Sequence, residues 1–319
     1  MKIINVSVNE AGQRLDKLLC KYLNLAPKSF IYKMLRKKNI TLNGKKADGS
    51  EKLNMDDEIK LFLADETVDK FSELKVDKVS HNLNIIYEDK NILIINKPTG
   101  LLSQKASKED VSLVEHIISY LLDTGQITEN DLKSFKPGIC NRLDRNTSGI
   151  VVAGKTLTSL QTMAEVFRDR SIHKYYKCIV KGTISKKQYI EGYLVKDKKT
   201  NKVTVTKEKR KEGIFIQTEY EPLELNSEHS LLEVKLITGR SHQIRAHLSS
   251  IDHPIIGDFK YGNRTVNEFF KKNYHLEYQL LHSYKLIFPE FKNEFSYLSG
   301  KEFIAELPDQ FSRIKNDIF

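Results

Sequence analysis

The sequence has few cysteines and no long apolar run. The cysteines are three in number and lie far apart, at Cys20, Cys140 and Cys178. An odd number at such spacing argues against a disulfide framework and against a zinc cage. The first fifteen residues contain no apolar core of signal-peptide length, and nowhere do 18 apolar residues follow one another. We therefore expect a cytoplasmic protein with no membrane segment and no bound metal.

Internal repeats and low-complexity blocks are also missing, whereas positive charge is abundant. The formal net charge is +10 over 319 residues, and hydrophobic residues make up 39% of the chain. This length and hydrophobic content allow one large domain and one small one. Such a basic excess usually means a polyanionic partner, and a nucleic acid fits better than a membrane surface because no apolar anchor is present.

Residues 12–63 have the pattern of a small separate module. Apolar residues recur at helical spacing over 15–23 and again over 30–35, so each stretch predicts an amphipathic helix. Alternating residues then lead to Asn43-Gly44, a dipeptide that strongly favours a tight hairpin turn. A closing strand over 59–63 would complete a unit of two helices and a small sheet.

Many cations belong to this predicted module. They are Lys28, Lys33, Arg36, Lys37, Lys38, Lys45 and Lys46. The local pattern leaves two interpretations open: an RNA-docking face and a solvated lysine surface. The residues that follow, up to 82, are charged and aperiodic, so we expect a linker there.

The stretch CNRLDRNTSGIVVAGKT, residues 140–156, is the most informative part of the chain. It places the carboxylate of Asp144 between Arg142 and Arg145, which favour its ionised form. The Asn-Thr-Ser-Gly that follows is typical of a turn, and the β-branched run after it predicts a buried strand. Such a carboxylate can be a nucleophile or part of a surface ion-pair cluster, and local chemistry alone favours the cluster.

Two later stretches also carry polar groups in regular patterns. Alternation along the strand-like run 173–182 puts Tyr175 and Tyr176 on opposite faces, and core packing is the default for such tyrosines. In TGRSHQIRAHL, His242 and Arg245 are three residues apart and share one helical face. The histidines here could suggest a metal, but no cysteine or carboxylate shares their spacing.

Two further segments allow more than one interpretation. Residues 85–97 predict a hairpin that ends before Pro98, where Lys97 could touch phosphate but a structural turn is the safer interpretation. Between Lys196 and Lys211 lie eight lysines and arginines around a short alternating run. That segment could be a basic hairpin that grips an RNA backbone or a solvated loop.

The motif R-L-D-R-N-T-S-G at 142–149 resembles the signature loop of the pseudouridine synthases that modify large-subunit ribosomal RNA. The Lys-x-Tyr and Val-x-Gly elements of 174–182 and the G-R-S-H-Q-I-R-A-H of 239–247 are similar to two other stretches of that family. The resemblance covers nearly the whole chain. One departure is Asn141, where many members carry histidine; because Asn also donates and accepts hydrogen bonds, we treat it as a variant.

The resemblance implies a fold and a division of the chain. The fold expected is α+β, with a small helix-helix-hairpin RNA-binding module, similar to the S4 type, followed by a mixed, mainly antiparallel-sheet pseudouridine synthase domain. The module would span 1–64, the linker 65–82 and the catalytic domain 83–319.

The resemblance also implies site residues. The catalytic residues that it implies are Asp144, Tyr176 and Arg245, with Arg245 paired to the aspartate and Tyr176 against the target base. The RNA-binding residues that we expect are Arg142, Arg145, Arg36, Lys37, Lys38, Arg240 and His242.

The reaction implied is site-specific isomerisation of uridine to pseudouridine in RNA, with large-subunit (23S) ribosomal RNA as the expected target. The base is cut from its ribose, rotated and rejoined through carbon, so nothing is oxidised and we expect no cofactor and no metal. A carboxylate such as Asp144 can divide this change into easier covalent steps, and the uridine must be flipped out of folded RNA to reach it. We expect a monomer.

Two alternatives remain at this point. One is a non-catalytic RNA-binding or ribosome assembly factor, and the other is an RNA hydrolase that uses Asp144 with a histidine. Their products differ: isomerised uridine, unchanged RNA and cut RNA.

Overall fold

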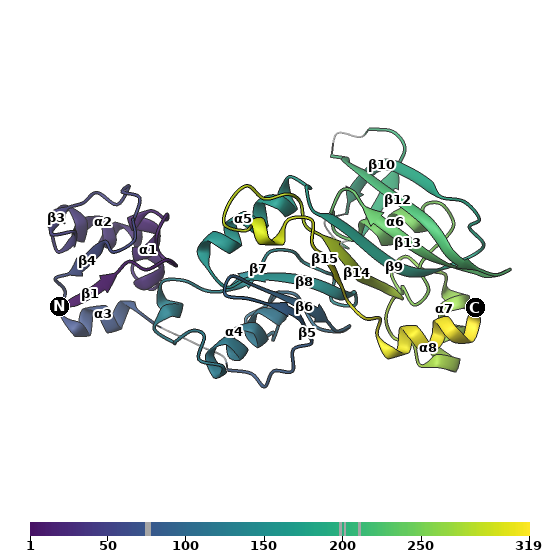
Figure 1. The fold of residues 1–319 in the computed structure, drawn as a ribbon, viewed down its shortest axis with the longest axis horizontal. Coiled ribbons are helices and arrows are strands. Elements are labelled where there is room, and N and C mark those ends of the chain that lie inside the picture. Colours follow the sequence, from purple (N-terminus) through teal and green to yellow (C-terminus); the bar gives the residue numbers. More distant parts are fainter. Residues whose placement is uncertain (74–77, 198–199, 201, 210–211) are drawn as a thin grey trace.

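The computed structural model describes residues 1–319 except 74–77, 198–199, 201 and 210–211. A small N-terminal part lies beside a larger body that is built on one long sheet (Figure 1). Among the described residues, none of the helices combines the length and the apolar character that crossing a membrane requires.

The N-terminal part has the two predicted helices and a small sheet with the strand order β1-β4-β2-β3. Its elements are β1 (Lys2–Asn5), α1 (Leu15–Tyr22), α2 (Lys28–Arg36), β2 (Ile40–Leu42), β3 (Lys45–Lys46) and β4 (Glu58–Leu61). The apolar stripes predicted for α1 and α2 meet in one core, in which Leu15, Leu19 and Leu35 are fully buried. Asn43 and Gly44 have φ values of 50° and 72°, as a tight hairpin turn requires. Strand β1, which the sequence did not indicate, pairs with β4 at the sheet edge.

A third helix, α3 (Asp65–Phe71), occupies the start of the segment predicted as a linker. Val68 is only 2% exposed and packs in the N-terminal core, and the ring of Phe71 lies 4.7 Å from that of Phe30. The chain therefore stays attached to the module beyond residue 64, because two apolar side chains on a charged helix are enough to hold it there. Residues 74–77 of the predicted linker lie outside the described residues.

The larger body has the mixed, mainly antiparallel sheet that was predicted. Its order is β11-β10-β12-β13-β9-β14-β8-β6-β5, with β15 beside β14 and β7 beside β8. The strands are β5 (Ile85–Glu88), β6 (Ile92–Lys97), β7 (Gly138–Ile139), β8 (Ser148–Gly154), β9 (His173–Lys181), β10 (Gln188–Lys196), β11 (Val203–Thr206), β12 (Ile214–Leu225), β13 (His229–Leu236), β14 (Leu281–Ile287) and β15 (Glu302–Ile304). The helices are α4 (Leu113–Asp123), α5 (Leu157–Arg168), α6 (Gln243–Ser249), α7 (Arg264–Tyr274) and α8 (Asp309–Ile318).

Apolar layers cover both faces of β6 and β8. Val151 of β8 packs in a cluster with Ile117 of α4, whereas its neighbour Val152 packs in a second cluster with Met163 of α5 and with Phe288. A strand that is buried on both faces needs an unbroken apolar run, which explains the continuous hydrophobic sequence of β8.

Gly149 joins the two central strands. Strands β8 and β14 pair in parallel, with Gly149 opposite Ser283, and this is the one parallel pairing among the described strands. A Cβ atom at Gly149 would lie 2.2 Å from the Ser283 carbonyl oxygen, and the φ of Gly149 is +113°. Only glycine fits this position. The turn that precedes it, with Asp144, is therefore fixed at the centre of the sheet.

The basic segment 196–211 forms a hairpin in its described part. Strand β10 pairs with β11 in antiparallel register, and the N–H of Val203 donates to the hydroxyl of Tyr261 at 3.0 Å. Residues 198–199, 201 and 210–211 of this segment lie outside the described residues. The strands of the hairpin are thus anchored to the body, beside the loop that contains Tyr261.

Candidate active site

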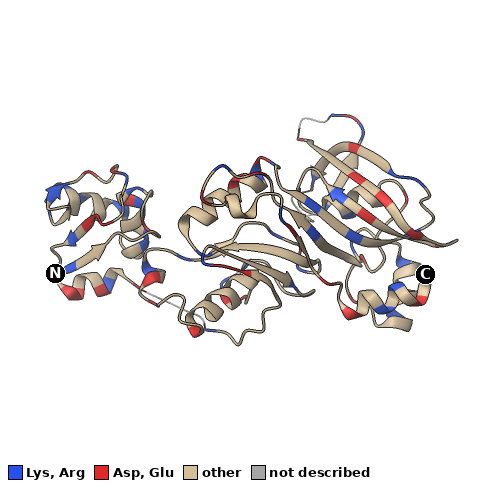
Figure 2. Cartoon of the chain, in the orientation of Figure 1, with Lys and Arg blue, Asp and Glu red and all other residues tan. Residues whose placement is uncertain are grey.

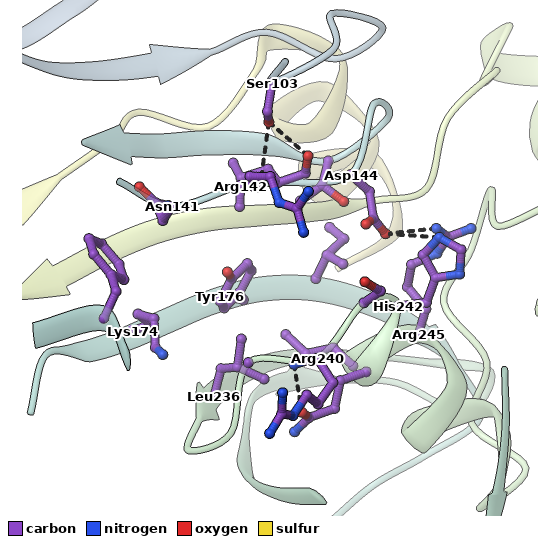
Figure 3. A pocket seen from close by; sticks show the side chains of 18 of the residues that line it. Ser103, Asn141, Arg142, Asp144, Lys174, Tyr176, Leu236, Arg240, His242 and Arg245 are labelled. Carbon is purple, nitrogen blue, oxygen red and sulfur yellow. Dashed lines mark hydrogen bonds and ion pairs between the residues drawn. The ribbon is translucent and has the colours of Figure 1, made fainter. Parts of the chain in front are cut away.

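A cavity of about 870 Å³ lies where the signature loop (residues 142–149), strand β9 and the start of α6 meet (Figure 3). The side chains that line it include those of Asp144, Tyr176, His242 and Arg245. Three stretches that are far apart in the sequence thus contribute to one pocket, and they are the three that the sequence analysis selected.

Buried side chains hold the backbone on both sides of Asp144. The Ser103 hydroxyl donates to the Leu143 carbonyl at 2.8 Å and accepts the Leu143 N–H at 3.0 Å. The fully buried Lys97 donates to the Arg145 carbonyl at 3.1 Å and to two carbonyls of its own turn. Burial lowers the pKa of Lys97 to about 7, and the charge of Asp144 acts in the opposite direction. Lys97 therefore has the structural role that was the safer interpretation.

Arg245 approaches Asp144 from α6. Its Nη1 donates to Asp144 Oδ2 at 2.8 Å, while Nε and Nη2 donate to the two carboxylate oxygens of Asp258 at 2.7 and 2.9 Å. Burial works to lower the pKa of Arg245, but the hydrogen bonds and charges of the two carboxylates raise it overall. One guanidinium therefore links two carboxylates and stays charged.

Asp258, in the loop 256–262, is the one residue of this network that the sequence did not single out. It is fully buried, and its Oδ1 also accepts the backbone N–H groups of Lys260 and Tyr261 at 2.9 and 3.1 Å. A signal was present in the sequence. An arginine has five N–H donors, so a buried Arg245 needs a second acceptor besides Asp144, and Asp258 is the one carboxylate of that loop.

His242 precedes α6 in a left-handed backbone conformation, with φ at 57°. Its Nδ1 lies 2.8 Å from the Tyr261 hydroxyl, and its Nε2 lies 3.8 Å from Asp144 Oδ2. Burial lowers the pKa of His242, while the charge of Asp144 acts to raise it. His242 therefore lies outside the helix on which the spacing predicted it, but it and Arg245 both approach Asp144.

Tyr176 projects from β9 into the cavity and is 7% exposed. Burial raises the pKa of its phenol to about 12, against a lowering effect of a hydrogen bond with Ser283. The phenol is therefore neutral near pH 7, and it offers an aromatic face rather than a base. Tyr175 lies on the opposite face of the strand, where Lys285 Nζ is 4.4 Å from its ring centroid.

The other site residues predicted in the larger body lie partly inside and partly outside the cavity. Arg142 and Arg240 are exposed and line the cavity. Arg145 does not line it, and its Nε donates to the Gly100 carbonyl at 3.0 Å. The Asn141 side chain donates to and accepts from the backbone of β8, at 3.1 and 2.8 Å, so it connects the loop to that strand.

The other three predicted RNA-binding residues, Arg36, Lys37 and Lys38, are exposed at the end of α2 in the N-terminal part and do not line the cavity. The part of the chain that the structure describes has no group of three histidine, cysteine or acidic residues arranged to hold a metal. His247, one of the histidines considered for a metal, is buried and lies 2.9 Å from the Thr218 hydroxyl.

Comparison with known proteins identifies the family to which the chain belongs. The model of the RNA pseudouridylate synthase family matches residues 91–250, and the S4 domain model matches residues 13–59. The chain belongs to the RNA pseudouridylate synthase family. It is an isomerase that acts on RNA, and the predicted S4-type module is confirmed. Asp144, Tyr176 and Arg245 fall inside the matched range, whereas Asp258 lies beyond it.

Individual relatives cover most of this pseudouridine synthase. It is 33% identical to an uncharacterized RNA pseudouridine synthase of Mycoplasma genitalium, over 91% of both chains. It is 34% identical to ribosomal large subunit pseudouridine synthase D of Borreliella burgdorferi, over 96% of this chain and 89% of that one. The solved structure of human RNA pseudouridylate synthase domain containing 4 has the same fold, with a TM-score of 0.57 and 24% identity over 72% of this chain and 90% of that one.

Proposed function

We propose that this pseudouridine synthase isomerises uridine at defined positions of large-subunit ribosomal RNA, with Asp144 as the catalytic carboxylate. The observation that carries the proposal is the position of Asp144, whose side chain is 27% exposed to the cavity while Arg245 holds one of its oxygens. Relatives named ribosomal large subunit pseudouridine synthases C and D support the choice of RNA.

Asp144 has one oxygen available for chemistry. Oδ2 accepts the hydrogen bond from Arg245, whereas Oδ1 accepts none from the described residues. A carboxylate can add to the ribose or the base, or remove a ribose proton, and so divide one hard step into easier ones. We assign this role to Oδ1. Arg245 would keep the Asp144 side chain oriented.

The cavity also has to keep water from the detached base, since hydrolysis would release it. Apolar side chains of Leu143, Leu236 and Leu281 line the cavity together with the ring of Tyr176. The proposal places the flipped uracil against Tyr176, between this apolar wall and Asp144. Arg142, Arg240 and His242 would contact the RNA around the flipped nucleotide, and Arg145 would bind backbone outside the cavity.

The N-terminal part would dock RNA away from the cavity. Figure 2 shows lysine and arginine along this part and across the strands of the body. We propose residues 1–64, extended by α3, as the docking module, with contacts through Arg36, Lys37 and Lys38, and residues 83–319 as the catalytic domain. A monomeric enzyme in the cytoplasm would fit these roles.

The test is to map pseudouridines in ribosomal RNA from a strain that lacks this chain, with and without a plasmid that supplies it. We expect specific positions to lose the modification and to regain it with the wild-type plasmid. Asp144→Asn should restore none of them, although the purified variant should keep its melting temperature and bind RNA nearly as well. An unchanged map would contradict the ribosomal target, and substantial product from purified Asp144→Asn would contradict the catalytic role.

A further inference from the structure

Lys174 is a buried cation that projects into the cavity. It lies on β9 two residues before Tyr176, so both side chains point to the same face, roughly 7 Å apart along the strand. The residue is 8% exposed, and the side chain lines the cavity. Figure 3 shows Lys174 on the side away from Asp144 and Arg245, with Tyr176 between. The proposed function gives Lys174 no role.

The ammonium group of Lys174 has no partner of opposite charge in the part of the chain that the structure describes. Among the described residues, Lys174 Nζ donates no hydrogen bond and forms no ion pair. The described residues that line the cavity include seven lysines and arginines but a single carboxylate, that of Asp144, which Arg245 already binds. Burial, with the charge of Arg170, lowers the pKa of Lys174 to about 8, so the group is still mostly protonated at pH 7. A buried, unpaired charge of this kind destabilises the free protein.

The neighbouring cation Arg170 is presented by a fixed turn. Its φ is 69°, a left-handed conformation that residues other than glycine adopt uncommonly. The Asp169 carboxylate stabilises this turn by accepting the N–H and the hydroxyl of Ser171 at 2.9 and 2.7 Å. Asp169 does not line the cavity, whereas Arg170 does. The turn therefore directs the Arg170 side chain towards the cavity and leaves the Asp169 carboxylate outside it.

We propose that Lys174, with Arg170 and Arg240, forms a phosphate subsite that holds a backbone phosphodiester next to the uridine in the cavity. The inference rests on the proposed function, since it assumes that the uracil lies against Tyr176. The uracil is uncharged and cannot form an ion pair with Lys174, whereas each phosphodiester carries one negative charge and acceptor oxygens. The compact ammonium group of lysine suits such a point charge. The subsite would set which nucleotide reaches Asp144.

Neutral linkages in the RNA test this subsite directly. The probe is a short RNA that spans a mapped target uridine, with one phosphodiester at a time replaced by an uncharged methylphosphonate. We expect replacement of one linkage beside the target to lower the affinity of the wild-type protein about tenfold. Lys174→Met should bind the unmodified RNA about tenfold more weakly and should be insensitive to that same linkage. The logarithm of its affinity should also fall less steeply with the logarithm of the salt concentration. The slope should be smaller by about 0.7, the value for one lost phosphate contact.

Lys177→Met is the matched control. Lys177 lies on the same strand but on its other face, where Nζ is 4.6 Å from the Tyr284 ring centroid, so the variant loses the same charge outside the cavity. We expect it to show the wild-type response to every linkage. Lys174→Met should keep or raise the melting temperature, because it removes an unpaired buried charge; a lysine with a merely structural role would lower it. Lys174→Gln is a second variant for the same series if the methionine variant does not fold.

The outcomes separate this inference from the proposed function. Equal sensitivity of wild type and Lys174→Met to every neutral linkage would overturn the phosphate subsite while leaving isomerisation intact. A wild-type protein that forms no pseudouridine in any ribosomal RNA would instead overturn the proposed function.

Discussion

Asp258 binds two nitrogens of Arg245 and leaves the third for Asp144. Two parallel hydrogen bonds fix the plane of the guanidinium, so its remaining Nη1–H points at the Asp144 carboxylate. Asp258 is fully buried and Arg245 is nearly so, which makes each costly without the other. The orientation of Asp144 thus depends on a second carboxylate that is fully buried and does not line the cavity.

Asp258→Asn should reduce turnover roughly tenfold to a hundredfold with little change in KM, because Arg245 loses its fixed orientation while the RNA contacts remain. The free energy of unfolding should fall by about 3 kcal/mol, since a buried pair loses one partner. Steady-state kinetics and urea unfolding measure the two effects. Glu268→Gln, at an exposed pair with Arg264, is the control and should change neither. Normal turnover in Asp258→Asn would show that Arg245 needs no such support.

Arg245→Lys should slow the chemical step roughly a hundredfold, because a single ammonium cannot bind Asp144 and Asp258 together with the geometry of the guanidinium. Single-turnover assays at saturating enzyme isolate that step from RNA binding. A near-normal rate would mean that Asp144 keeps its orientation without Arg245.

Removal of residues 1–72 should leave a body that isomerises uridine but captures RNA poorly. The cut falls after α3, because Val68 and Phe71 pack in the N-terminal core and an earlier cut would leave these two apolar side chains exposed. The Glu10–Ser134 hydrogen bond of 2.6 Å, which ties the two parts, would be lost. Affinity for a ribosomal RNA fragment should fall less steeply with salt than in the full chain. Equal slopes would mean that the basic surface of the module does not touch RNA.

Acid should destabilise the protein between about pH 6.5 and pH 4 through His282. Its Nδ1 lies 2.8 Å from the Ser148 hydroxyl and its Nε2 lies 3.2 Å from the Ala305 carbonyl, which suits a neutral ring. Burial lowers the pKa of His282 to about 4. The unfolded chain takes up a proton below about pH 6.5 and the folded chain does not, so stability is lost as pH falls through this window, by about 3 kcal/mol.

Urea unfolding at several pH values from 7 to 4 measures this loss. His282→Gln should flatten the curve, although His247, whose pKa burial also lowers to about 4, adds a similar slope. His275→Asn is the control, because His275 is exposed in a left-handed conformation that asparagine tolerates. An unchanged slope in His282→Gln would contradict the assignment.

The sequence was sufficient for the elements with strong local patterns. These elements depend on neighbours within a few residues. They are the Asn43-Gly44 turn, the apolar strand after Asp144, and the approach of His242 and Arg245 to Asp144 from one side. The family motifs added Tyr176, whose strand position alone predicts only core packing.

The features that were missed depend on distant contacts. Asp258 looks like an ordinary loop residue until the fold buries it against Arg245. Helix α3 is mostly charged, and only its contact with the N-terminal core distinguishes it from a linker. The burial of Lys174 likewise depends on a distant contact, because alternation puts it on the opposite face from Lys177 but does not say which face lies against a cavity.

The position of β14 has a consequence for folding during synthesis on the ribosome. This strand lies between β9 and β8, although it begins at Leu281, 100 residues after the end of β9 at Lys181 and still further after β8. Asp144 precedes one of these strands and Tyr176 lies on the other, so the two halves of the active site meet only when the late strand enters between them. A nascent chain that has not yet released residues 281–287 therefore contains Asp144, Tyr176 and Arg245 but lacks the strand that brings Asp144 and Tyr176 together.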